Sequence, residues 1–149
     1  MAARMPTITD VLDALARRLT EAGVAAYSPD GAYPTTPAAP PVFFGQLYPT
    51  PDLQVAISHY WTDPNPMTQR GNPTVRVQLR WRGDKNPTTV HSLADAAYAA
   101  LHTMTPGLWP GGVRILWCSR QLVAPIEPDA NGRWERADSY EIQCNPIGA

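Results

Sequence analysis

Cysteine and lysine are scarce in this sequence. Its 149 residues include two cysteines, and Lys85 is the single lysine beside eleven arginines. Cys118 and Cys144 are too few for a disulfide scaffold, and no Cys-x-x-Cys pair is present for a metal or redox site. We therefore expect two buried free thiols, while a bridge remains an alternative if the last two strands form a hairpin centred on Asn131. The excess of arginine indicates either bidentate interface contacts or merely a GC-rich coding sequence.

Long apolar runs and a strong net charge are also absent. No stretch reaches the roughly eighteen consecutive apolar residues of a transmembrane helix, and the first six residues lack the apolar segment of an export signal. The formal net charge is -1, which excludes a strong overall field that would attract nucleic acid or an anionic membrane. We expect synthesis in the cytoplasm and no membrane partner.

Catalytic motifs are missing as well. The sequence has no Gly-x-Ser-x-Gly elbow, no Gly-x-x-x-x-Gly-Lys phosphate loop and no His-Glu-x-x-His helix, so we predict no catalytic residue, no metal and no cofactor. His91 and His102 lie eleven residues apart in one predicted helix, about 16 Å by helical rise, and cannot share a metal ion. A small hydrolase that uses His59 or His91 with a nearby aspartate remains the enzymatic alternative. His59 is expected on an apolar strand face together with Val55, Ile57 and Trp61.

The clearest element present is the segment Thr74–Arg82, in which apolar and polar residues alternate strictly. Successive side chains of a strand point to opposite faces, so the pattern predicts a strand with one core face and one face that meets solvent or a partner. The predicted core face carries Val75, Val77, Leu79 and Trp81. The other face carries Arg76, Gln78, Arg80 and Arg82.

Two stretches have helical periodicity. Residues 8–22 carry one apolar stripe, with Thr7 as the N-cap, Asp10 three residues later and Gly23 as the residue that ends the helix. Residues 88–104 form the second predicted helix. Its expected core positions are Val90, Leu93, Ala94, Ala97, Leu101 and Met104.

Further strands are predicted at residues 42–48, 54–61, 113–119 and 140–144. The segment 113–119 does not alternate cleanly in its middle, which favours a central strand covered on both faces. Tyr140, Ile142 and Cys144 are expected to point inward. Asn131-Gly132 fits the two positive φ values of a tight hairpin turn.

These elements predict a single α+β domain over residues 1–149. We expect a two-layer sandwich, with a mixed, mostly antiparallel sheet of four to five strands and two helices on one face. Two proline-rich segments stay outside the sheet: an arm at residues 28–41 and a projecting loop at residues 62–73. Pro34, Pro37 and Pro40 have the spacing of a polyproline ligand, so the arm is either an adaptor motif or, as we favour, a connector that packs on its own domain or a neighbouring copy.

Several stretches together resemble one protein family. They are Leu12-Asp-Ala-Leu-Ala16, Tyr27-Ser-Pro-Asp-Gly-Ala-Tyr33, Val75 to Gly83, Leu93 to His102, Gly112-Val-Arg114 and Pro128 to Tyr140. In order and spacing they resemble the tail terminator proteins of long-tailed actinobacterial phages, often called minor capsid proteins. The long part of the arm from Pro34 to Pro41 and the tryptophans Trp81, Trp109 and Trp117 depart from the family pattern.

The resemblance implies a structural virion protein of the siphophage neck, at the head–tail junction. Such proteins form a ring, usually a homohexamer, that caps the head-proximal end of the tail tube and joins it to the head connector. The implied partners are other copies of the chain, the major tail tube protein and the connector or stopper protein. DNA would pass through the lumen without sequence-specific binding. The alternative within this class is a head-completion or stopper protein.

We expect subunit or partner contacts on the outer strand face, the loop and the arm. The candidates are Arg76, Arg80, Arg82, Asp63, Gln69, Arg70, Pro34, Pro37 and Pro40.

Overall fold

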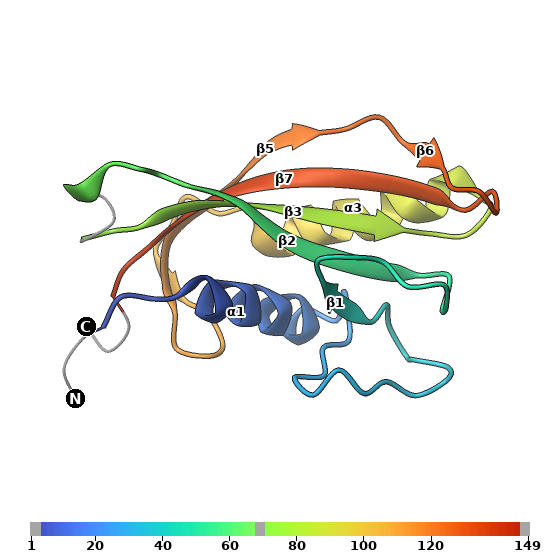
Figure 1. The fold of residues 1–149 in the computed structure, drawn as a ribbon, viewed down its shortest axis with the longest axis horizontal. Coiled ribbons are helices and arrows are strands. Elements are labelled where there is room, and N and C mark those ends of the chain that lie inside the picture. Colours follow the sequence, from blue (N-terminus) through green and yellow to red (C-terminus); the bar gives the residue numbers. More distant parts are fainter. Residues whose placement is uncertain (1–3, 68–70, 147–149) are drawn as a thin grey trace.

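The computed structural model describes residues 4–67 and 71–146, so Gln69 and Arg70 lie outside the described residues. The elements named in the described residues are two helices and the strands of a mixed sheet, as predicted for an α+β fold (Figure 1). The helices are α1 (Ile8–Glu21) and α3 (Pro87–Leu101). The strands are β1 (Val42–Phe44), β2 (Gln54–Thr62), β3 (Thr74–Arg82), β4 (Gly107–Leu108), β5 (Arg114–Val123), β6 (Glu127–Pro128) and β7 (Trp134–Cys144).

The sheet has the order β1-β2-β3-β7-β5-β4, and β6 pairs with β7. Among the described strands, β1 and β2 run parallel and the other strand pairs are antiparallel. The described strands number seven rather than the expected four to five, because three short strands of two or three residues extend the four long ones. The predicted strand Thr74–Arg82 has the predicted bounds and lies in the middle of the sheet.

Helix α1 begins where its capping residues predict. The Thr7 side chain accepts a hydrogen bond from the backbone N–H of Asp10, and the Asp10 carboxylate accepts one from the N–H of Thr7. This reciprocal pair satisfies two backbone donors that a helix start leaves free. Gly23, with φ of 76°, follows the C-cap and ends the helix as predicted.

Helix α3 differs from its prediction at both ends. Asn86 is the N-cap and accepts from the N–H of Thr88, while Pro87 occupies the first turn, where it has no intrahelical donor to lose. The helix ends at Leu101, so Met104 lies beyond it and is exposed. The expectation that Met104 belongs to the core is wrong, because the chain leaves the helix one turn earlier.

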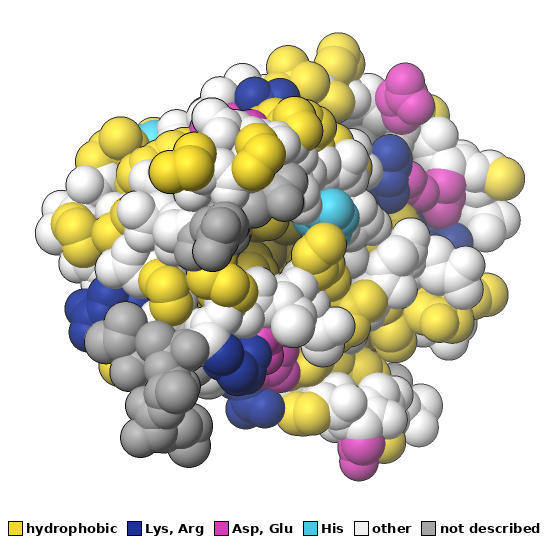
Figure 2. Space-filling model, turned by 60° about the vertical axis from the view of Figure 1, so that its left-hand side comes forward, with side chains coloured by type: hydrophobic (Ala, Val, Ile, Leu, Met, Phe, Trp, Pro, Cys, Tyr) yellow, Lys and Arg dark blue, Asp and Glu magenta, His cyan; other side chains and the backbone are white. Residues whose placement is uncertain are grey.

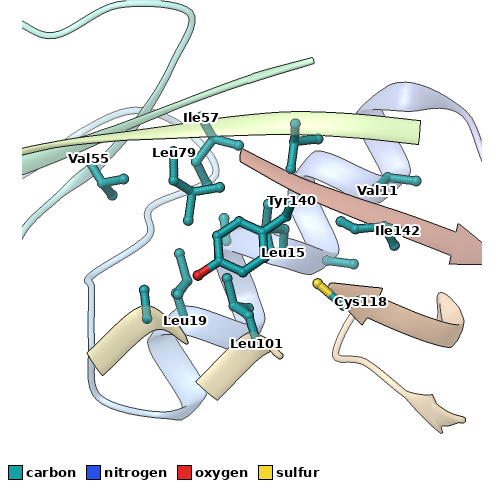
Figure 3. Close-up of a cluster of buried hydrophobic side chains, with 14 of the residues drawn as sticks. Val11, Leu15, Leu19, Val55, Ile57, Leu79, Leu101, Cys118, Tyr140 and Ile142 are labelled. Atoms are coloured by element: carbon teal, nitrogen blue, oxygen red, sulfur yellow. The ribbon is translucent and has the colours of Figure 1, made fainter. Parts of the chain in front are cut away.

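Both helices contribute to one core against the face of β3 that carries its apolar side chains. That core includes Val11, Leu15 and Leu19 from α1 and Val90, Ala94, Ala97 and Leu101 from α3. Tyr140, Ile142 and Cys144 of β7 point inward as predicted. Figure 3 shows the Tyr140 ring in the middle of this core, with the side chains of Leu15, Leu19 and Leu101 around it.

A β-bulge in β2 reverses the expected orientation of Trp61. His59 pairs with Val77, but Trp61 pairs with Arg76, so Tyr60 is the extra residue. The bulge changes the alternation by one residue and places Trp61 on the face of Arg76, not on the apolar face of His59. The predicted shared face of His59 and Trp61 is therefore wrong.

Apolar and polar residues do not alternate regularly in β5, but the cause is not the predicted burial of both strand faces. Its pairing with β7 shifts register between Ile115 and Trp117 and again between Arg120 and Leu122. It is next to the sheet edge, followed only by the two-residue strand β4. The central position predicted for this segment is therefore wrong, because the broken pattern comes from two bulges.

The turn before β7 is less tight than predicted. Gly132 has a positive φ of 78°, whereas no described residue other than glycine has one, so Asn131 does not adopt the expected conformation. The N–H of Gly132 bonds to the carbonyl of Asp129, and the N–H of Asp129 bonds to the carbonyl of Arg133. A single left-handed residue is sufficient for this longer loop.

Candidate interaction surfaces

The face of the sheet opposite the core carries two cross-strand ion pairs between β3 and β7. The Arg76 guanidinium lies 2.7 Å from the Glu141 carboxylate, and that of Arg80 lies 3.3 Å from the Glu135 carboxylate. The side chains of Arg76 and Arg80 are 40% and 43% exposed. The candidate interface arginines on this face are accessible, but a carboxylate on the same face compensates each charge.

Two tryptophans extend this outer face. The Arg76 guanidinium lies 4.3 Å from the centre of the Trp61 ring, a cation–π contact that the bulge at Tyr60 makes possible. Trp117 of β5 donates from its indole nitrogen to the Gln143 side chain at 3.0 Å. The face is thus a continuous polar and aromatic surface.

Arg82 lies on the same face of β3 as Arg76 and Arg80, but it is buried. It is only 3% exposed, and its guanidinium donates to the carbonyls of Tyr48, Pro51 and Asp52 at 2.7–2.8 Å. Burial is also the main cause that lowers the pKa of Arg82. The expectation that Arg82 joins Arg76 and Arg80 at an accessible surface is wrong, because residues 48–52 fold over its end of the strand.

Two more side chains hold the segment 48–53. The buried Gln54 amide bonds to the backbone N–H and carbonyl of Tyr48 and to the carbonyl of Pro51. Arg133 of the turn before β7 donates to the carbonyl of Pro49 and pairs with the Asp52 carboxylate at 3.2 Å. The segment is therefore held by residues of β2, of β3 and of the turn before β7.

The proline arm packs on its own domain, as the favoured interpretation expected. The Tyr33 hydroxyl donates to the carbonyl of Val42 at 2.6 Å, and Ala26 forms a parallel bridge with Pro41. Pro34 is exposed, while Pro37 and Pro40 are half-buried. Residues 35–41 and 51–53 enclose a shallow apolar groove of about 260 Å³.

The projecting loop lies at the opposite end of the sheet from the arm (Figure 1). Its described part begins with the backbone N–H of Asp63 bonded to the carbonyl of Thr74, and the Asp63 carboxylate accepts from the N–H of Asn65. Met67 is highly exposed. A second hollow of about 300 Å³ opens between the two ends of this loop and the start of α1, and Figure 2 views the molecule from this side.

An ion network between β7 and α3, buried at its β7 residues and exposed at its α3 residues, was not predicted from the sequence. Arg136 and Asp138 form a bidentate pair at 2.8–2.9 Å, and Arg136 also binds Asp95 at 3.0 Å and the His91 ring at 2.9 Å. Because both β7 residues point toward the helix, the charges fix α3 on the sheet. The sequence signal for this network is the spacing of Arg136 and Asp138. Oppositely charged residues two positions apart in a strand lie on the same face and can pair.

The histidines occupy separate places. His59 bonds to the Thr62 hydroxyl at 2.8 Å, His91 contacts Arg136, and the His102 ring accepts from the N–H of Arg120 at 3.4 Å. Within the described residues, no cluster of three or more His, Cys, Asp or Glu side chains could hold a metal ion. None of the helices in that part of the chain is long and apolar enough to cross a membrane.

The two cysteines are free and buried, as expected. They are not opposite each other: Cys118 pairs with Ile142, and Cys144 pairs with Ile115. Burial raises the pKa of both thiols, that of Cys144 to about 12.

Comparison with known proteins gives one family. A family model described as "Bacteriophage tail terminator protein" matches residues 18–146. No curated protein matches the chain. One similar solved chain comes from a structure titled "Virion of native gene transfer agent (GTA) particle", with 15% identity, a TM-score of 0.46 and coverage of 72% of this chain and 78% of that one. Since the family model covers most of the sequence, the chain belongs to the bacteriophage tail terminator proteins and is a structural component of the virion.

Proposed function

We propose that this chain forms a closed ring that caps the head-proximal end of the tail tube, stops its growth and offers a surface to the head connector. The match to the tail terminator family over residues 18–146 is the observation that carries this proposal. We take six subunits as the working number. The partners are then other copies of the chain, the tube protein and the connector or stopper protein.

A ring of this kind needs two unlike lateral patches on each subunit, because only head-to-tail contacts at the right rotation close on themselves. The two surfaces that face along the tail axis must also differ from each other. One binds the end of the tube, and the other must not bind a further layer of tube protein. The ends of the sheet meet this need. One carries the arm and the fixed segment 48–53, and the other carries the loop that begins at Asp63.

The outer sheet face and these two ends are the interface candidates. Arg76 and Arg80 are accessible for contacts, as are parts of the proline arm. Arg82 instead acts inside the subunit by holding the segment 48–53. The role is one of shape and contact, and we assign no residue to catalysis.

Inactivating the gene for this chain in its phage tests the proposal, with tail length measured by electron microscopy. A terminator's loss gives overlong tubes, whereas loss of a stopper protein gives tails of normal length and heads that leak DNA. Complementation with the intact gene should restore uniform tails. Normal tails and sound heads without the chain would contradict the proposal.

A further inference from the structure

Exposed apolar side chains gather at the two opposite edges of the sheet. Seven of the nine large hydrophobic residues that are exposed in the described part of the chain lie there. The β1–β2 edge carries Phe44, Tyr48 and Tyr60, here called the aromatic edge. The β4–β5 edge carries Met104, Leu108, Leu122 and Val123, here called the aliphatic edge.

The aromatic edge is open along half of β2. Among the described residues, β1 pairs with β2 only from Val55 to Ile57, which leaves residues 58–62 without a strand on that side. Tyr60, the bulge residue, lies in this open part and is 51% exposed. A bulge with a large exposed ring is unsuited to simple strand addition but provides a protruding apolar contact.

The aliphatic edge is similarly open. β4 pairs only with Arg114 and Ile115, so in the described chain no strand lies outside residues 119–123 of β5. Leu122 follows a register shift in this open part and is 61% exposed. Each edge thus has a short outer strand and a stretch without one, but the exposed side chains differ: aromatic at the first edge and aliphatic at the second.

The charges of the two edges have opposite signs. The sequence from Pro34 to Met67 contains Asp52 and Asp63 but no lysine or arginine, and that from Met104 to Ile126 contains Arg114 and Arg120 but no carboxylate. Intrachain ion pairs at 3.2 Å for Asp52 and 3.8 Å for Arg120 reduce this difference. Apolar burial would therefore supply most of the binding free energy, and charge would favour the pairing of unlike edges.

We propose that the aliphatic edge of one copy of this chain packs against the aromatic edge of the next copy. The two edges lie on opposite sides of the same sheet, with β1 at one end of its strand order and β4 at the other. The contact therefore joins unlike surfaces head-to-tail, and each further copy adds in the same direction. Aromatic rings against methionine and branched aliphatic side chains are a favourable combination. The inference rests on the proposed ring and names its lateral surfaces.

Cysteine cross-linking in assembled particles tests this contact. Tyr60→Cys and Leu122→Cys, each with a different tag, are produced together during infection by phage that lacks the natural gene, and purified particles are treated with a flexible bis-maleimide. We expect a cross-linked species that contains both tags, and no more than background when one variant is present alone. The natural thiols are buried, so they contribute little. A chain with both substitutions should give a ladder that stops at the subunit number of the ring.

A matched pair on the helices is the control. Thr9→Cys and Ser92→Cys are exposed on α1 and α3, belong to neither edge, and should give no mixed species. Leu122→Asp should reduce incorporation into particles at least tenfold, whereas Ser92→Asp should not.

Two results would overturn the inference. Cross-linking of a single edge variant to itself would mean that like edges meet, and particles that contain both variants without the mixed species would mean that the edges do not meet. If such particles still showed closed rings and normal tails, the proposed function would stand. Normal tails in particles without the chain would remove the proposed function itself.

Discussion

Gly83 lies so close to Val90 that a Cβ atom added to the glycine would be 2.9 Å from the Val90 backbone nitrogen. The close approach joins the end of β3 to the first turn of α3. Gly83→Ala should therefore lower the free energy of unfolding by about 1–3 kcal/mol, because backbone rather than a flexible side chain must move. Gly107→Ala is the control, since its Cβ would meet nothing within 4 Å. Equal effects of the two substitutions in denaturant titrations would contradict this account.

Arg82→Met should be far more damaging than Arg80→Met. The first change leaves the carbonyls of residues 48–52 without their buried donor and should cost about 2–3 kcal/mol. The second removes a half-exposed ion pair and should cost at most about 1 kcal/mol. Thermal unfolding measures the difference, and limited proteolysis should show new cleavage in residues 46–53 of the Arg82 variant alone.

Asp10 should make the stability depend on pH in the acid range. The Arg4 hydrogen bond, with those of Thr7, lowers the pKa of Asp10 from 3.8 to about 2. A carboxylate with a lower pKa in the folded state stabilises the fold above about pH 4, its unfolded pKa, and this contribution is lost as the pH falls toward 2.

Asp10→Asn should accordingly lower the unfolding free energy by about 1 kcal/mol at pH 7, through loss of the capping box, and by less at pH 2. Urea titrations at several pH values measure this. Glu127→Gln, the same chemical change on an exposed strand residue, is the control and should show no comparable loss at pH 7.

Both thiols should be unreactive in the native protein. Burial raises the pKa of Cys144 to about 12 and also raises that of Cys118, so the reactive thiolate is rare at neutral pH. A maleimide should react roughly a hundredfold or more slowly than with an unfolded chain, where two thiols become accessible. Rapid labelling of a thiol without denaturant would contradict the buried positions.

The loop of residues 63–72 should matter for assembly rather than for folding. We expect that replacing it with a short glycine-serine linker leaves the thermal unfolding temperature within a few degrees but changes tail length or infectivity, because we propose that the loop projects toward a neighbouring subunit or the lumen. Normal tail lengths and infectious particles from the variant would refute this role.

Regular local patterns predicted much of the fold. Thr7, Asp10 and Gly23 mark helix α1 because capping depends on residues close together in the chain. The alternation of β3 predicted its bounds because all nine residues remain in register with β7. Strand β7 was predicted only from Tyr140 onward, since Arg136 and Asp138 make its first half resemble an exposed segment although they neutralise each other inside.

The errors arise where distant residues decide the outcome. Trp61 changes face because Tyr60 is inserted without a partner, and pairing is not visible in one strand's sequence. Arg82 continues an alternating row, but residues 48–52 cover it from another part of the chain. The gathering of Tyr60 and Leu122 at opposite edges likewise depends on strand order, which the periodicity of single segments does not contain.

The position of β7 has a consequence during protein synthesis. The last described strand, β7, fills the middle of the sheet between β3 and β5. Until the ribosome has released residues 134–144, the nine residues of β3 have an unpaired side that can aggregate. Products that end before residue 134 therefore cannot complete the sheet, because β3 and β5 then lack the strand that pairs with both.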